Sequence, residues 1–101
     1  MISHSEARAK LASNTGVLLL DVRNEVEYQA KHISNSLLIP LDRLSEMAAQ
    51  KLPDREQEII VHCQSGGRSK MAVELLKRMG YTKVYNLGGI NSWPYEIISG
   101  R

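Results

Sequence analysis

One segment near the middle of the chain restricts its fold more than any other feature. A run at residues 58–62 with the apolar, β-branched Ile59, Ile60 and Val61 at its centre leads directly into Cys63, and residues 64–69 include two adjacent glycines. Residues 68–79 follow with apolar side chains at helical spacing. β-branched residues favour strands, and glycines permit tight turns. The segment therefore predicts a buried strand, a tight loop and a helix, with the cysteine at the helix N-terminus.

Patterns typical of strands and of helices alternate along the whole chain of 101 residues. Apolar runs predict further strands at 17–20, 37–39 and 84–87. Helical patterns predict helices at 3–13, 24–30 and 42–51, and Gly88-Gly89 is expected to turn the chain into a final helical segment. Buried strands that alternate with helices predict one α/β domain over residues 1–101 with a mainly parallel sheet.

Local signals predict where several of these helices begin and end. Ser3 with Glu6 and Asn24 with Glu27 have the spacing of capping boxes. Asn14-Thr15-Gly16 is expected to end the first helix, and Gly80 the helix at 68–79. Three methionines, at helix positions expected to face the core, need no functional role: Met47, Met71 and Met79.

Composition and charge narrow the function classes. A hydrophobic share of 43%, a charged share of 24% and a net charge of +2 with scattered Lys and Arg are typical of a soluble globular protein and argue against a nucleic-acid partner. No apolar run has membrane-spanning length and the start does not read as a signal peptide, so we expect no membrane partner and a cytoplasmic protein. One cysteine excludes an internal disulfide, and the three histidines lack ligand spacing, so we expect no metal site.

Cys63 is the candidate nucleophile. Backbone N–H groups of a tight loop and the dipole of the following helix stabilise negative charge, which predicts a lowered thiol pKa. Arg68 adds positive charge five positions on, without a carboxylate nearby in the sequence. The alternative is an inert, buried cysteine beside a simple glycine turn. The ordered set Cys63, Ser65, Gly66-Gly67, Arg68 and Ser69 favours the reactive thiol.

Four motifs, in order, resemble the single-domain rhodanese (thiosulfate sulfurtransferase-like) family over nearly the whole chain. They are Leu-Asp-Val-Arg at 20–23, the Glu-Tyr to His-Ile segment at 27–33 that continues to Pro40, the cysteine loop at 63–69, and Leu-Gly-Gly-Ile at 87–90 with Trp93. Lys31 and Asn35 stand where the family has glycines, and Leu38 where asparagine or histidine is frequent; Asn is the residue that best replaces glycine in the left-handed region. Gln64 stands where some members carry arginine, which weakens the case for thiosulfate as the preferred donor.

The resemblance implies a three-layer fold with helices on both faces of the sheet, and sulfur transfer through a persulfide on Cys63. A donor such as thiosulfate loads the cysteine, and a thiol or cyanide unloads it, with no cofactor. Arg68 joins Cys63 as a catalytic residue, and the loop residues expected to bind substrate are Gln64, Ser65, Gly66, Gly67 and Ser69.

The resemblance also assigns a supporting role to one pair of residues, and position in the chain indicates two more. Asp21 and Arg23 are expected to form a structural ion pair, with Glu27 as a further member. His62 is expected to pack beneath the loop rather than act as a base, because adjacent residues of a strand point to opposite faces. Trp93 is expected to anchor the last helical segment in the core.

Two other functions stay open at this point. A cysteine phosphatase or arsenate reductase also combines His-Cys with a loop arginine, but those loops place five residues between the cysteine and the arginine, and here there are four. A smaller ring of donors suits one sulfur atom better than a phosphoryl group. The second alternative is a sulfur-relay or partner-docking module, in which another protein loads or unloads Cys63.

Overall fold

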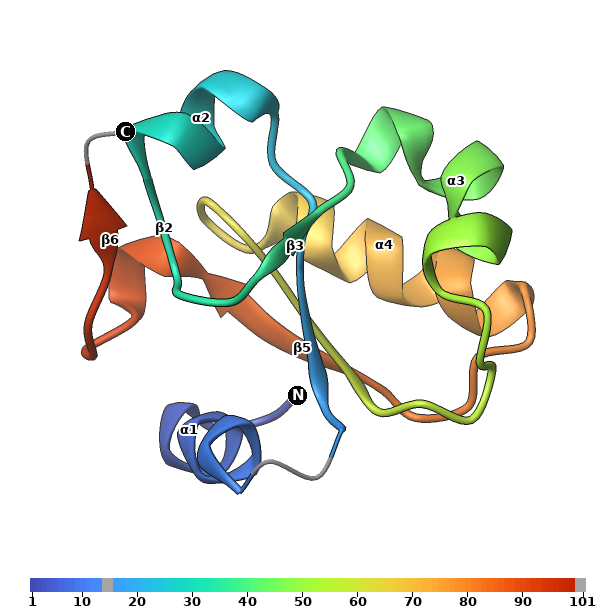
Figure 1. Cartoon of the computed structure of the whole chain (residues 1–101), viewed down its shortest axis with the longest axis horizontal. Coiled ribbons are helices and arrows are strands. Elements are labelled where there is room, and N and C mark those ends of the chain that lie inside the picture. Colours follow the sequence, from blue (N-terminus) through green and yellow to red (C-terminus); the bar gives the residue numbers. More distant parts are fainter. Residues whose placement is uncertain (14–15, 100–101) are drawn as a thin grey trace.

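The computed structural model describes residues 1–13 and 16–99, and its centre is a parallel sheet (Figure 1). In this part of the chain the sheet has four strands, in the spatial order β3 (Leu37–Leu38), β1 (Leu18–Asp21), β4 (Ile59–Cys63) and β5 (Val84–Gly89). Each neighbouring pair is parallel. The carboxyl ends of the strands therefore meet along one edge, where ligands bind in sheets of this kind.

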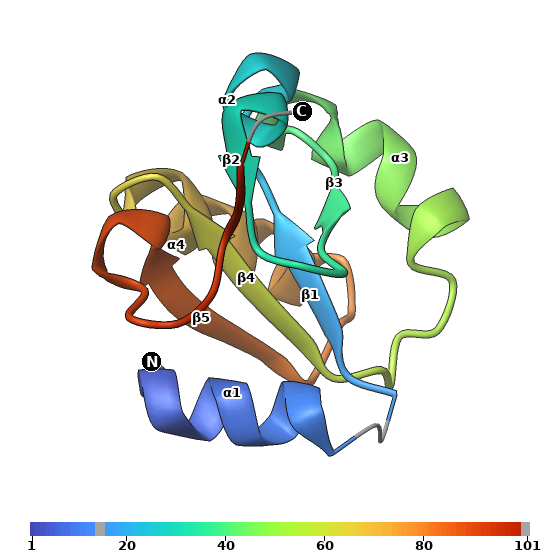
Figure 2. The same ribbon diagram turned by 60° about the vertical axis from the view of Figure 1, so that its left-hand side comes forward.

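Helices cover both faces of this sheet (Figures 1 and 2). They are α1 (His4–Ala12), α2 (Glu25–Ala30), the 3₁₀ helix η1 (Leu41–Arg43), α3 (Leu44–Lys51), α4 (Gly67–Arg78) and the 3₁₀ helix η2 (Ile90–Ser92). α1 lies on one face, and α3 and α4 pack on the other. The predicted α/β fold with a mainly parallel sheet between helical layers is confirmed. No helix within residues 1–13 and 16–99 has the length and apolar character needed to cross a bilayer.

The side chains of β4 divide between two cores. Ile59, Val61 and Cys63 belong to the core beneath α3 and α4, whereas Ile60 belongs to the core beneath α1. All five residues of β4 are buried. The alternation turns His62 away from the face that carries Cys63, as strand geometry requires.

The predicted helix starts are confirmed by their hydrogen bonds. The Ser3 hydroxyl accepts from the Glu6 N–H at 3.1 Å, and the Ser3 N–H donates to Glu6 at 3.2 Å. Asn24 and Glu27 form the same reciprocal pair at 2.8 and 2.9 Å. Asn35 adopts a positive φ of 65°, so it takes the left-handed conformation expected of a glycine substitute.

Several details differ from the sequence prediction. Met71 is 59% exposed, so its expected core position is wrong; it lies on the solvent side of α4. Gly88 and Gly89 belong to β5, and the expected final helical segment is only the short η2. Asn14 and Thr15, which were expected to end α1, lie outside the described residues.

A small antiparallel pair was not predicted. β2 (Lys31–His32) pairs with β6 (Ile98–Ser99) outside the main sheet. Strands of two residues carry too little periodic pattern to be detected in a sequence. This pair ties the end of the described chain to the segment that follows α2.

Candidate active site

The Cys63 sulfur lies in a cradle made by the loop that joins β4 to α4. Gly66 adopts φ 116°, a conformation that residues with a side chain rarely adopt. The turn brings the Gly66 N–H back toward Cys63, with 2.9 Å between its nitrogen and Sγ. No side chain among the described residues caps α4, so the first N–H groups of the helix remain available to the sulfur.

The acidity of this thiol depends on two opposing effects. Cys63 is 1% exposed, and burial acts to raise its pKa. The Ser69 side chain and the backbone N–H groups of Ser69, Gly66 and Ser65 act in the opposite direction. The donors outweigh burial, so the pKa of Cys63 lies below its ordinary value, in the direction that the sequence predicted.

Ser69 connects the sulfur to β5. Its Oγ lies 3.5 Å from Cys63 Sγ, 2.9 Å from the Gly66 carbonyl oxygen and 2.8 Å from Asn86 Oδ1. Asn86 Oδ1 also accepts from the Gly88 N–H at 2.9 Å. Asn86 was missed in the sequence, because its only local signal is a polar residue inside an otherwise apolar strand.

The first half of the loop is held by side chains from two other segments. The Gln64 amide accepts from the Arg23 guanidinium at 3.1 Å and donates to Asn91 Oδ1 at 2.7 Å. The Asn91 N–H donates to the Gln64 carbonyl oxygen at 3.2 Å. Gln64, an expected substrate-binding residue, therefore has its side chain engaged in holding the loop.

Gly89 allows the strand to approach this loop closely. A Cβ on Gly89 would meet the Gln64 carbonyl oxygen and would lie 2.7 Å from Ser65 Cα. Both obstacles are backbone atoms, which cannot move aside as a flexible side chain can. The Gly-Gly pair of the sequence therefore has a role in contact with the loop, in addition to its place in β5.

The expected ion pair between Asp21 and Arg23 is present and buried. The guanidinium donates to both carboxylate oxygens at 2.9–3.1 Å, and the two side chains are at most 1% exposed. His62 lies beside them, with its Nε2 3.6 Å from Asp21 Oδ2 and without a hydrogen-bond partner among the described residues. Burial lowers the pKa of His62, against the attraction of Asp21, and so disfavours the charged imidazolium.

Arg68 forms its own ion pair, which the sequence did not predict. Its two terminal nitrogens donate to the two oxygens of Glu27, each at 2.8 Å. The Arg68 side chain holds the pKa of Glu27 at about 2. Glu27 thus joins Arg68 rather than the pair of Asp21 and Arg23. The expectation of an arginine charge without a nearby carboxylate is corrected, because α2 brings a carboxylate that lies 41 positions away in the sequence.

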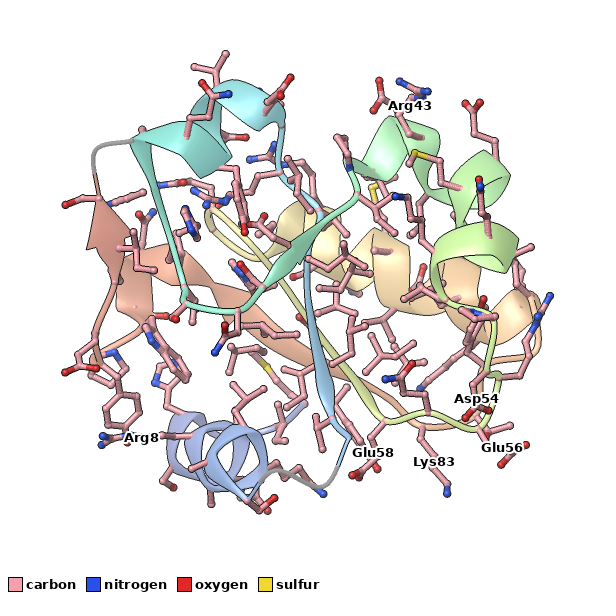
Figure 3. All side chains as sticks on the ribbon, in the orientation of Figure 1. Arg8, Arg43, Asp54, Glu56, Glu58 and Lys83 are labelled. Carbon is pink, nitrogen blue, oxygen red and sulfur yellow. The ribbon has the colours of Figure 1, made fainter. Side chains whose placement is uncertain are left out.

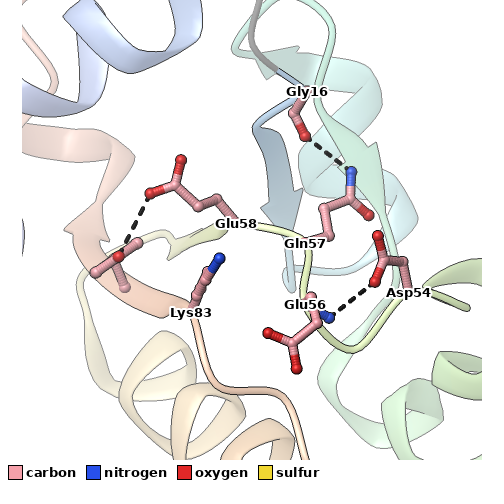
Figure 4. A pocket seen from close by; sticks show the side chains of 7 residues that line it. Gly16, Asp54, Glu56, Gln57, Glu58 and Lys83 are labelled. Atoms are coloured by element: carbon pink, nitrogen blue, oxygen red, sulfur yellow. Dashed lines mark hydrogen bonds between the residues drawn. The ribbon is translucent and has the colours of Figure 1, made fainter.

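Two cavities lie at opposite ends of the sheet. One of about 360 Å³ adjoins Arg68 at the carboxyl edge, and its other lining residues are Val22, Arg23, Asn24, Pro40, Leu41 and Asp42. A larger one of about 630 Å³ lies at the amino edge, lined by Gly16, Asp54, Glu56, Gln57, Glu58, Lys83 and Tyr85. Figure 3 shows the charged residues of the second cavity gathered at one end of the molecule, and Figure 4 shows them from close by.

The chemistry of the site is that of an activated thiol. In residues 1–13 and 16–99, no three His, Cys, Asp or Glu side chains are grouped so that they could hold a metal ion. The structure brings the expected residues Ser65, Gly66 and Ser69 to the sulfur, and Gly67 begins α4. Gln64 and Arg68 lie in the same loop and helix start, but their side chains bind other protein groups.

Comparisons with known proteins identify the family of the chain. The family model of the Rhodanese-like domain matches residues 3–96. Thiosulfate sulfurtransferase PspE of Escherichia coli (strain K12) is 39% identical over 81 residues, which are 80% of this chain and 78% of that protein. The human single-domain sulfurtransferase TSTD1 superimposes with a TM-score of 0.83 at 32% identity, over 92% of this chain and 93% of that one. The putative sulfur carrier protein YrkF of Bacillus subtilis (strain 168) is 37% identical over 93 residues, which are 91% of this chain and 49% of that protein.

Proposed function

The chain belongs to the rhodanese-like domain family and is similar to sulfurtransferases, and from this premise we propose that it transfers a sulfane sulfur through a persulfide on Cys63. The donor is a small sulfur compound such as thiosulfate, and the acceptor is a thiol, or cyanide in an assay. The convergence of hydrogen-bond donors on one buried sulfur is the observation that carries this proposal. It also favours sulfur transfer over hydrolysis of phosphate esters.

The reaction has two displacements at sulfur. In the first, the Cys63 thiolate attacks the outer sulfur of thiosulfate, the S–S bond breaks, and sulfite leaves with the bonding electrons. In the second, an acceptor thiolate or cyanide attacks the outer persulfide sulfur, and Cys63 leaves as a thiolate. No general base is needed, because both steps use an anion that N–H donors already stabilise.

The cradle supports this mechanism through the position of its donors. The N–H groups of Ser65, Gly66 and Ser69 are held by the loop before any substrate binds, so the stabilisation of negative charge requires no rearrangement. The chain has a single cysteine, so the thiol that is loaded and the thiol that is unloaded are the same group.

Intact mass spectrometry tests the proposal directly. After incubation with thiosulfate, the wild-type protein should gain the mass of one sulfur atom and lose it again when cyanide or a thiol is added. Cys63→Ser is the matched control, since it replaces the sulfur with an oxygen of similar position and should gain nothing. A Cys63→Ser protein that keeps its turnover, or a wild type that no donor loads, would refute the mechanism.

The similarity to the putative sulfur carrier protein YrkF supports one alternative, a relay in which a partner protein loads or unloads Cys63. The same experiment separates the two roles. A free enzyme turns over many equivalents of thiosulfate with a small acceptor. A relay protein is loaded once and then returns its sulfur slowly to cyanide and small thiols.

A further inference from the structure

The Ser69 hydroxyl has one proton and three acceptors around it. Asn86 Oδ1 lies at 2.8 Å, the Gly66 carbonyl oxygen at 2.9 Å and Cys63 Sγ at 3.5 Å from its Oγ. A hydroxyl group donates one hydrogen bond and can accept two. The direction in which Ser69 donates therefore decides whether the sulfur faces a proton or a lone pair.

The orientation of the Asn86 amide follows from its other neighbour. The Gly88 N–H points at one atom of this amide from 2.9 Å, and a backbone N–H can only donate, so that atom is the oxygen. The same oxygen faces Ser69, for which it is the nearest acceptor. The Gly66 carbonyl, the second acceptor, already receives the Lys70 N–H at 3.2 Å. Each of these two oxygens already receives one other N–H, so the shorter distance to Asn86 Oδ1 is what favours donation from Ser69 to Asn86 when the sulfur carries its own proton.

We propose that Asn86 is a positioning residue that holds the Ser69 hydroxyl proton while Cys63 is a thiol and releases it to the sulfur when Cys63 becomes an anion. In the thiol form, Cys63 S–H donates to Ser69 Oγ, and Ser69 O–H donates to Asn86 Oδ1. When the thiol proton leaves to solvent, the Ser69 O–H rotates about the Cβ–Oγ bond and donates to the thiolate. No covalent bond of Ser69 changes.

Asn86 is suited to this exchange because it is satisfied in both states. Its oxygen keeps the Gly88 N–H bond when Ser69 turns away, so no buried acceptor is left without a partner. Ser69 is fully buried, so water does not compete for its proton. The exchange therefore replaces one hydrogen bond with a stronger one to an anion.

The charged groups around the sulfur are paired with other residues or lie away from it, so the neutral Ser69 hydroxyl is the group that can respond to the charge on Cys63. Arg68 on α4 is bound to Glu27 of α2, and Arg23 is bound to Asp21 of β1. His62, on the opposite face of β4, is buried with a lowered pKa. On β5 the titratable residue is Tyr85, whose hydroxyl lies 3.4 Å from Glu58 at the far end of the sheet.

Alkylation of Cys63 by iodoacetamide across pH tests the role without any sulfur transfer. In Asn86→Asp, the carboxylate accepts from the same two donors but binds the hydroxyl proton more strongly, because its hydrogen bond is charge-assisted. Alkylation near pH 7 should then be about tenfold slower, with an unchanged limiting rate at high pH. An unchanged rate near pH 7 would overturn the proposal.

The matched control is the same substitution in a Ser69→Ala background. There Asn86→Asp acts only through its charge, and should slow alkylation by about threefold at most. Equal slowing in the two backgrounds would also overturn the proposal, because the hydroxyl would then have no part in the effect. If Asn86→Asp does not fold, as judged by circular dichroism, Asn86→Ala serves instead. Loss of the competing acceptor should make Cys63 alkylate faster at low pH, and slower alkylation would contradict the role.

The importance of this hydrogen-bond exchange for persulfide chemistry rests on the proposed function. The two proposals are refuted by different results. If the alkylation pattern is found but neither thiosulfate nor any other sulfur donor loads the wild type, the sulfur-transfer proposal is wrong and the role of Asn86 stands. If thiosulfate loads Cys63 but Asn86→Asp slows alkylation equally with and without the Ser69 hydroxyl, the proposed role of Asn86 is wrong and the sulfur-transfer proposal stands.

Discussion

The hydrogen bonds of polar groups are arranged differently at the two ends of the central sheet. At the carboxyl end, donors from Ser65, Gly66 and Ser69 converge on one sulfur that is 1% exposed. At the amino end, the hydrogen bonds do not converge on one buried atom: Gln57 donates to the Gly16 carbonyl oxygen, and Glu58 accepts from Lys10 and from the Tyr85 hydroxyl. Figure 4 shows the bond of Gln57 to Gly16 and, apart from it, the bond of the Glu56 N–H to Asp54, so these bonds do not run toward one point.

The cavity at the amino end is nevertheless the larger, about 630 Å³ against about 360 Å³ beside Arg68. Volume alone would therefore point to the amino end, whereas the proposed nucleophile lies at the carboxyl end. A reaction needs donors fixed on the atom where charge develops, and the residues around the larger cavity, three carboxylates and Lys83 among them, do not converge on one atom. Comparable changes made at the two ends of the sheet should therefore have very different effects on Cys63.

The largest effect is expected from a change in loop length. One glycine inserted after Gly66 should reduce sulfur transfer by about a hundredfold, because an error near 1 Å keeps the N–H groups from meeting on the sulfur. A glycine inserted after Glu56, in the turn at the amino end, is the control and should leave turnover within about twofold. Thiosulfate:cyanide turnover and aryl phosphate hydrolysis should be measured on all three proteins. Efficient phosphatase turnover by the wild type, without a persulfide, would instead assign the protein to the cysteine phosphatases.

Glycine-to-alanine substitutions at the two ends should lower the free energy of unfolding by different amounts. At Gly89, the new Cβ would meet backbone atoms of Gln64 and Ser65, and the free energy of unfolding should fall by about 3 kcal/mol. At Gly16, with φ 82°, no described atom lies within 4 Å, and only the backbone strain of about 1 kcal/mol remains. Urea denaturation measures both. Equal losses would mean that β5 and the loop are not tightly packed.

The local part of this structure could be predicted from the sequence. The apolar runs, both capping boxes and the glycine-rich start of α4 are signals carried by neighbouring residues, and each element formed where its signal lay. The position of Cys63 at the end of a strand and the start of a helix follows from the same signals. Strand alternation was enough to separate Cys63 from His62.

The contacts that tune the site could not be predicted in the same way. Glu27 reaches Arg68 across 41 positions, and Asn91 reaches Gln64 across 27. Such pairs depend on the register of β1, β4 and β5, including the irregularity between Val61 and His62, and a single sequence does not reveal this register. The arginine was visible in the sequence, but its partner was not.

A smaller effect is expected from loss of the Glu27 charge. Glu27→Gln leaves the Arg68 charge unpaired, so Cys63 should alkylate about threefold faster near neutral pH, and the gain should shrink in high salt. The pKa of Glu27 is lowered to about 2, so in the wild type the pair contributes stability above the ordinary carboxyl range and loses it as pH falls toward 2. Thermal unfolding followed from pH 6 to pH 2 should therefore show the variant and the wild type converging in acid. An unchanged alkylation rate would mean that the Arg68 charge does not reach the sulfur.

The smallest effect is expected from the matching change at the other end. Glu58 accepts from Lys10 at 2.8 Å, the same distance that joins Glu27 to Arg68, and the two pairs are similarly exposed, but this pair lies at the amino end of the sheet. Lys10 lowers the pKa of Glu58, so acid again removes the pair, and salt screens it because both side chains are partly exposed. Glu58→Gln should lower the melting temperature slightly at low salt and leave Cys63 alkylation and sulfur transfer unchanged. Both variants replace a paired carboxylate with an amide of the same shape, so they differ chiefly in which end of the sheet loses charge. If Glu58→Gln altered the alkylation rate as much as Glu27→Gln, the charge at the amino end would be acting on the sulfur, and the separation of the two ends would be wrong.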